Sequence, residues 1–365
     1  MALHNIDTVS IPSVVTPVLA AILIALKMAG IVPADAALIL ILAAVLLGAS
    51  IFAAVHHAEV LAARVGEPFG AIILAFAVTI IEVALIVSIM LSGGPSVEVV
   101  ARDTVFSAVI IVLNGVIGLC LVLGGKRHHE QSFQLDSASA SLAVLGTIAT
   151  LVMILPNFTA NGGPDGYGAP QLLFIGAVCL AIYAVFVFIQ TIRHRDYFMD
   201  EADDPEAGVP HKPPAKVTLT SVVLLPLSLT MVVLLAKTLS APLEAGVAAA
   251  GLPPAFVGVV IAGIVLLPEG IASVSAALRN RLQNSINLVL GAAMASIALT
   301  IPVVAVVSVV AGLNLRLGLS PEHMVLLILT LFVSTLTLGT GRTTVLQGAV
   351  HLGIFAVFIL LSALP

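Results

Sequence analysis

Charged residues are scarce in this sequence. Asp, Glu, Lys and Arg together make up 9% of its 365 residues, whereas about a quarter of a soluble globular domain is charged. Hydrophobic residues make up 60% and the mean hydropathy is +1.21. The apolar residues fall in repeated runs of about 20, long enough to cross the hydrocarbon core of a bilayer. This composition excludes a soluble globular protein and predicts an integral membrane protein with many spans.

Cysteine is also rare. The chain has two, Cys120 and Cys179, and both lie in apolar runs. They support neither a disulfide framework nor a metal site, and we expect them to act as small buried hydrophobes. The first ten residues, MALHNIDTVS, contain no Lys or Arg and are followed by further spans, so we expect no cleaved signal peptide.

The apolar runs are separated by charges, polar patches and clusters of Pro and Gly. Dividing the chain at these points predicts an all-α polytopic membrane protein with about eleven transmembrane helices. One connection, roughly residues 193–217, is long and hydrophilic, and the others are short. The expected spans are residues 14–31, 34–53, 69–91, 103–124, 137–155, 170–192, 218–240, 252–277, 284–312, 323–339 and 344–364.

Basic residues are distributed unequally between the two ends of these spans. Ten Lys and Arg lie in connections on the N-terminal side, and four lie on or near the opposite side. Because cytoplasmic loops carry the excess of Lys and Arg, we expect the N-terminus and the long connection in the cytoplasm and the C-terminus outside. The pairs His56–His57 and His128–His129 are expected in cytoplasmic loops, either solvated or acting as pH sensors.

The long connection is acidic. A self-repelling, solvated linker between two halves of the protein is the simpler interpretation. The alternative is a loose attractor of divalent cations, since the spacing matches no EF-hand loop. Its six carboxylates fall within eleven positions, at Asp196, Asp200, Glu201, Asp203, Asp204 and Glu206.

The chain contains a weak internal repeat. An offset of 187 residues aligns FGAIILAFAVTIIEVALIVS with FVGVVIAGIVLLPEGIASVS and places Glu82 on Glu269. Each glutamate then lies in the second helix of a five-helix set, and a set with an odd number of helices is inverted when it is repeated. We therefore expect an N-terminal helix (1–33), a first five-helix repeat (34–192), an acidic cytoplasmic linker (193–217) and a second, inverted repeat (218–365).

Glu82 and Glu269 differ from the other acidic residues because both fall deep inside expected spans. An intramembrane carboxylate is energetically expensive and is a functional candidate by default. Basic residues are missing at a comparable depth in the sequence, so a purely structural ion pair is the weaker interpretation. Counted from opposite faces, both glutamates reach just past the middle of the membrane, where a cation and protons would compete for the same oxygens.

A few oxygen-bearing residues accompany the glutamates. Thr79 lies three residues before Glu82, on the same helix face, and Asn114 interrupts the apolar stretch VLNGVIG. Pro268 removes a helix hydrogen bond directly before Glu269 and frees a backbone carbonyl. Ligation by oxygen alone suits a hard cation such as Ca²⁺. The expected cation-binding residues are Glu82, Glu269, Thr79, Asn114 and Ser296, whereas His351 and Gln347 are expected to pack or to form hydrogen bonds.

The stretch LLPEGIASVSAALRNRLQNSINLVLGAAMASIALTIP resembles the second α-repeat of the cation/calcium exchanger superfamily, and particularly the bacterial calcium (sodium)/proton antiporters of the ChaA type. The resemblance extends over nearly the whole chain. It implies proton-driven export of Ca²⁺ across a bacterial plasma membrane, with Na⁺ or K⁺ as alternative substrates. It also matches Glu82 and Glu269 to the paired ligands of that superfamily. Leu266 and Ala292 replace polar residues that are usual there, and fewer side-chain oxygens favour a broader range of cations.

The sequence therefore predicts a secondary transporter, not an enzyme, that exchanges Ca²⁺, Na⁺ or K⁺ for H⁺ by alternating access. The expected partners are inorganic cations, protons and the lipid bilayer, without a cofactor or nucleic acid, and the oligomeric state is left open. A cation channel remains an alternative, and it would pass ions without a proton gradient. An intramembrane enzyme using the two carboxylates as acid and base is another. The absence of His, Cys, Lys and Arg near either glutamate in the sequence counts against it.

Overall fold

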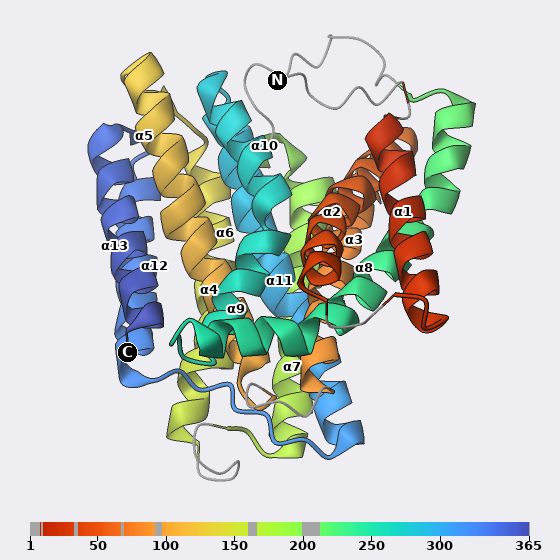
Figure 1. Ribbon diagram of the computed structural model, residues 1–365. Coiled ribbons are helices and arrows are strands. Elements are labelled where there is room, and N and C mark those ends of the chain that lie inside the picture. Colours follow the sequence, from red (N-terminus) through yellow and green to blue (C-terminus); the bar gives the residue numbers. More distant parts are fainter. Residues whose placement is uncertain are drawn as a thin grey trace. The chain divides into compact units, whose positions relative to one another are not determined.

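The protein is almost entirely helical in the computed structural model (Figure 1), which describes residues 8, 10–32, 36–66, 69–91, 97–159, 166–198 and 212–364. Ten of the helices in this part are long and apolar enough to cross a membrane, and a bent helix pair provides an eleventh candidate span. The chain is thus a multi-pass integral membrane protein. It divides into two compact units, one of Met1–Gly94 with Pro205–Ala249 and one of Pro95–Asp204 with Ala250–Pro365.

The described residues of the smaller unit form four helices. The long helix α2 (Ala37–Val65) packs against α1 (Ile11–Met28), α3 (Phe69–Met90) and α8 (Ala215–Ala249). Both α1 and α3 also contact α8. The unit therefore joins the first three helices of the chain to a helix that follows the acidic linker.

The larger unit begins with an unusual continuous span. Helix α4 (Val100–Ile110) passes through a π-helical segment, η1 (Ile111–Val116), into α5 (Ile117–His128). Then come α6 (Leu135–Ala149) with η2 and η3 (Thr150–Ile154 and Leu155–Phe158), and α7 (Ala169–Phe188) with η4 and η5 (Ile189–Arg193 and Arg195–Phe198). After the linker and α8, this unit continues with α9 (Phe256–Val265), α10 (Leu267–Leu278), α11 (Leu282–Ala311), α12 (Pro321–Leu338) and α13 (Val345–Ala363).

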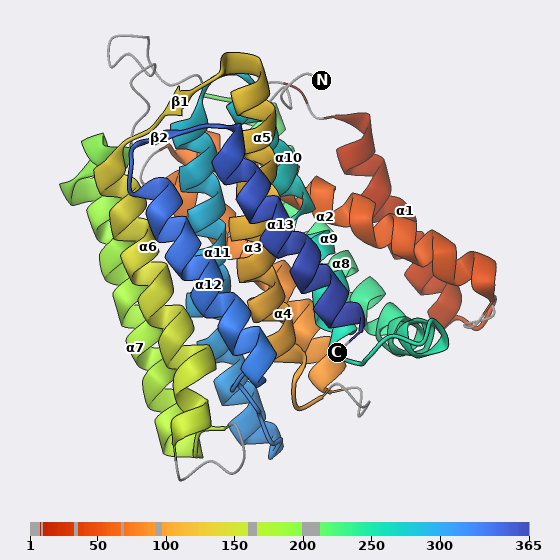
Figure 2. The ribbon, with the colours of Figure 1, turned by 90° about the vertical axis from the view of Figure 1, so that its left-hand side faces the viewer.

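Within this unit the span α4–η1–α5 packs against α9, α10, α11 and α13. Two-residue strands, β1 (Gln131–Ser132) and β2 (Arg342–Thr343), pair antiparallel beyond the ends of α5 and α12 (Figure 2). One close helix approach joins α13 to α5 and requires glycine. A Cβ on Gly348 would stand only 2.7 Å from the amide nitrogen of Val122 and 2.8 Å from the carbonyl oxygen of Gly118.

The eleven expected spans are confirmed as helical segments, with shifted limits. The segment expected at 34–53 continues to Val65, and the one expected at 218–240 continues to Ala249. The span expected at 252–277 is broken at Leu266 into α9 and α10, which meet at an angle of 55°. Apolar runs locate helices well, but a helix can extend past the run where partners on other helices satisfy its polar residues.

The placement of His56 and His57 in a cytoplasmic loop is wrong. Both lie inside α2 and are buried. His57 Nδ1 is 3.0 Å from Ser221 Oγ on α8, and His57 Nε2 is 3.1 Å from the carbonyl oxygen of Ser13 on α1. A partner for each ring nitrogen explains why this imidazole tolerates burial among apolar helices.

The second histidine pair lies at the end of α5, where His128 Nε2 is 3.1 Å from the carbonyl oxygen of Leu278. The first carboxylate of the acidic linker, Asp196, lies in η5. The start of the linker is attached to the larger unit, because Asn287 Nδ2 donates to the carbonyl oxygen of Phe198 at 2.6 Å. The other five linker carboxylates, Asp200, Glu201, Asp203, Asp204 and Glu206, lie outside the described residues.

Candidate functional site

Glu269 lies where the span of α9 and α10 breaks. Helix α9 ends at Val265, and Leu267 begins α10 with Pro268 in its first turn. Proline has no amide hydrogen, so it cannot donate to the carbonyl oxygen one turn earlier. Glu269 follows directly in the first turn of α10, where the positive end of the helix dipole stabilises a negative charge. The break therefore brings a carboxylate and the N-terminus of a helix to the same point.

Two hydroxyl groups follow on the helices around Glu269. Ser273 is one turn beyond Glu269 on α10, and Thr300 is one turn beyond Ser296 on α11, which packs against α10. Ser273 and Thr300 are fully buried, and their hydroxyl oxygens have no hydrogen-bond partner among the described residues. Neither residue was predicted from the sequence. The available signal was their spacing, since Ser273 follows Glu269 by four residues and Thr300 follows Ser296 by four residues, which places each pair on one face of its helix.

Asn114 lies in the π-helical segment η1, which packs against both α10 and α11. Its side chain is fully buried and already hydrogen-bonded at both ends. Nδ2 donates to Thr330 Oγ1 on α12 at 2.8 Å, and Oδ1 is 3.0 Å from His351 Nδ1 on α13. His351 Nε2 is in turn 3.1 Å from Thr337 Oγ1. The expectation that His351 forms hydrogen bonds is confirmed.

Glu82 and Thr79 belong to α3 of the smaller unit. Both are buried, with exposed fractions of 4% and 6%. Thr79 Oγ1 donates to the carbonyl oxygen of Ala75 at 2.8 Å. Its hydroxyl hydrogen is thereby used within the helix, while the oxygen keeps lone pairs for another ligand.

The five expected cation-binding residues thus fall into two sets. Glu269, Asn114 and Ser296 lie on helices that pack against one another in the larger unit, and Glu82 and Thr79 lie in the smaller unit. Among the described residues, no group of three or more His, Cys, Asp and Glu could hold a metal ion. In the larger unit the candidate donors are one carboxylate, hydroxyls and an amide, and oxygen ligands of this kind are those that hard cations prefer.

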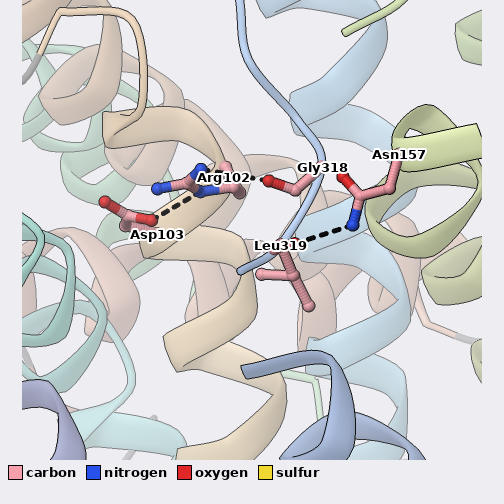
Figure 3. A network of polar contacts seen from close by, with 5 residues as sticks. All are labelled: Arg102, Asp103, Asn157, Gly318 and Leu319. Atoms are coloured by element: carbon pink, nitrogen blue, oxygen red, sulfur yellow. Dashed lines mark hydrogen bonds and ion pairs between the residues drawn. The ribbon is translucent and has the colours of Figure 1, made fainter. Parts of the chain in front are cut away.

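Besides Glu82, another buried carboxylate lies at the start of α4 (Figure 3). Asp103 Oδ1 accepts from Arg102 Nε at 2.8 Å, and Arg102 Nη1 donates to the carbonyl oxygen of Gly318 at 3.0 Å. Asn157 Nδ2 holds the next residue, Leu319, through its carbonyl oxygen at 2.7 Å. Asp103 therefore pairs with its sequence neighbour, and the network fastens the extended segment before α12 to α4 and η3.

Comparisons with known proteins agree with this architecture. A family model described as "Sodium/calcium exchanger protein" matches residues 36–192 and 220–364. The chain is 61% identical over 351 residues to y4hA of Sinorhizobium fredii, which is named in general terms as an ionic transporter, with 96% of this chain and 95% of y4hA covered. It is 35% identical over 314 residues to the sodium-potassium/proton antiporter ChaA of Escherichia coli, with 85% of each chain covered.

The solved structure of native YfkE is similar in fold. It matches with a TM-score of 0.72 at 16% sequence identity and covers 96% of this chain and 100% of that one. Its selenium-substituted form is described as a Ca²⁺/H⁺ antiporter.

Proposed function

Because the chain belongs to the sodium/calcium exchanger protein family, we propose that it is a secondary transporter that exchanges Ca²⁺, Na⁺ or K⁺ for protons by alternating access. Its relative ChaA is an antiporter, which favours exchange over a channel or an intramembrane enzyme. We further propose that the protein lies in a bacterial plasma membrane with its N-terminus and acidic linker in the cytoplasm. This orientation rests on the excess of Lys and Arg in the connections on that side.

The observation that carries the proposal is the position of Glu269 in the first turn of α10, at the break in an apolar span. Broken helices of this kind form the ion sites of many transporters, because the break exposes backbone groups within the membrane. The nearby hydroxyls of Ser273, Ser296 and Thr300 would add oxygens from the packed helices α10 and α11.

Competition between protons and cations for the glutamates would couple the two fluxes. In the alternating-access scheme, a carboxylate that has released its cation is neutralised by a proton before the empty site changes sides. A bound cation makes protonation unfavourable because it already supplies the positive charge. Glu82, supported by Thr79, would act in the same way in the first repeat. The cation and the proton would then cross in opposite directions.

The donor set supports a broad choice of cation. Ca²⁺ takes 6–8 oxygen ligands, and the described candidates include few carboxylates and several neutral oxygens. ChaA is named for sodium, potassium and protons. Transport of monovalent cations beside Ca²⁺ is therefore part of the proposal.

The test uses everted membrane vesicles that carry a preformed proton gradient. Addition of Ca²⁺, Na⁺ or K⁺ should dissipate the gradient, and Glu82→Gln and Glu269→Gln should each abolish this response. Glu130→Gln is the matched control, because Glu130 is an exposed carboxylate paired with Arg342 at 3.6 Å. Exchange that persists in both variants would exclude the two glutamates as the ion site, and cation flux independent of the proton gradient would indicate a channel.

A further inference from the structure

The buried network around Asn114 connects the candidate ion site to two helices that contribute none of the expected cation-binding residues. We infer that His351 on α13 is a positioning residue that, together with Thr330 on α12, fixes the orientation of the Asn114 amide. The inference rests on the proposed function, since it assigns Asn114 Oδ1 as a cation ligand whose direction is set by these two hydrogen-bond partners. All three residues have an exposed fraction of 0%.

The hydrogen bonds define which group donates at each point. Asn114 Nδ2 donates to Thr330 Oγ1, so Oδ1 faces His351. An amide oxygen can only accept, and His351 Nδ1 must therefore carry the hydrogen. In the neutral ring Nε2 is then an acceptor, which receives the hydroxyl hydrogen of Thr337. With the amide in this orientation, each donor in the chain meets an acceptor.

The π-helical segment η1 contacts both the helices of this network and the helix that carries Glu269. Both α12 and α13 contact η1, and a Cβ on Gly115 would stand 3.4 Å from the ring of Phe355 on α13. Helix α10 also packs against η1, and Val116 is adjacent to Gly270, the residue after Glu269: a Cβ there would stand 3.5 Å from Val116 Cγ2. Helices α12 and α13 thus hold the π-helical segment that carries Asn114 and contacts the start of α10.

The bond from His351 uses only part of the capacity of the amide oxygen. A carbonyl oxygen has two lone pairs, and His351 Nδ1 engages one of them. The second remains for a cation. Partners that orient a ligand in this way typically change metal affinity by about 10–100-fold when they are removed. His351 would accordingly affect how tightly the cation binds, without touching it.

Two substitutions of His351 separate this role from simple packing. In His351→Asn the side-chain nitrogen takes the place of Nδ1 and can still donate to Asn114 Oδ1, whereas in His351→Gln the nitrogen takes the place of Nε2 and reaches Thr337 instead. We expect His351→Gln to raise the half-saturating cation concentration about tenfold or more, with a similar maximal rate. His351→Asn should stay within about threefold of wild type, because the orienting bond is kept.

The measurement is exchange in everted vesicles over a range of Ca²⁺ and Na⁺ concentrations, with thermal stability of each purified variant recorded in parallel. Equal half-saturation in both variants, or equal losses of stability and maximal rate in both, would overturn the positioning role. If neither variant reaches the membrane, Thr330→Ser and Thr330→Val decide by the same criterion, since serine keeps the acceptor hydroxyl and valine removes it. A wild-type protein that exchanges no cation would refute the proposed function as well. If the wild-type protein exchanges cations and Glu269→Gln abolishes this exchange, a negative result for the His351 variants refutes only the positioning role.

Discussion

Replacing Gly348 with alanine tests the contact between α13 and α5. The new Cβ would stand 2.7 Å from Val122 N, 2.8 Å from Gly118 O and 2.8 Å from Leu121 Cβ. Unstrained carbon contacts are about 3.5 Å or longer, so the helices must separate by roughly 0.7 Å. Two of the three contacts are to backbone atoms, which cannot rotate away.

The energetic cost follows from this overlap. Inserting a methyl group into a packed helix contact costs about 1–3 kcal/mol, and three simultaneous contacts favour the upper end. Alanine recovers up to about 1 kcal/mol through its better helix propensity. The net loss is about 2 kcal/mol, equivalent to a fall of a few degrees in Tm.

The displacement should also reach the candidate site, because His351 lies one turn beyond Gly348 on α13. The distance between His351 Nδ1 and Asn114 Oδ1 is 3.0 Å, and a shift of roughly 0.7 Å would exceed the range of a good hydrogen bond. We therefore expect Gly348→Ala to raise the half-saturating cation concentration as well as to lower Tm.

The assay combines thermal unfolding of the purified protein with exchange in everted vesicles. Gly353→Ala is the control on the same helix, since a Cβ there meets no atom within 4 Å. This control should leave Tm unchanged or slightly raised, and exchange intact. A Gly348→Ala variant that matches Gly353→Ala in both measurements would refute the argument from helix contact.

Three further predictions concern other parts of the chain. His57→Leu leaves the hydroxyl of Ser221 without its buried partner and should reduce the free energy of unfolding by about 1–3 kcal/mol; an unchanged Tm would contradict this. Asn287→Ala removes the bond to the carbonyl oxygen of Phe198 and should speed proteolytic cleavage of the linker, detected by fragment analysis on gels, while equal cleavage rates would count against the attachment. Pro268→Ala restores an amide donor at the break between α9 and α10 and should slow exchange without lowering Tm; a fully active variant would show that the proline is not needed there.

Most of the fold could be predicted from the sequence because the dominant signal is local. A run of about 20 apolar residues has few alternatives to a spanning helix, and the expected segments are all helical. The ends of the helices were harder to predict from the sequence. The histidines of α2 resembled a loop, and only their distant partners, such as Ser221 at a separation of 164 residues, explain why the helix continues through them.

The candidate site was predicted in part for the same reason. Glu82, Glu269 and Asn114 stand out because each interrupts an apolar run. The partners of Asn114 could not be found in this way, since Thr330 and His351 are 216 and 237 residues away and only the packing of α12 and α13 on η1 brings them together. The division into two repeats stays a prediction. In the structure α8, the first helix of the expected second repeat, groups with α1, α2 and α3.

The π-helical segment η1 also affects how the two halves of the chain can be compared with each other. A π-helical turn holds one residue more than an α-helical turn, so a residue-by-residue alignment shifts within Ile111–Val116. Residues of α5 then align with the wrong face of any regular helix, displaced by about 100° of rotation. Corresponding residues of the two repeats therefore have to be aligned separately before and after η1. A one-residue gap in the alignment at η1 marks the change from α-helical to π-helical hydrogen bonding, not the loss of a residue.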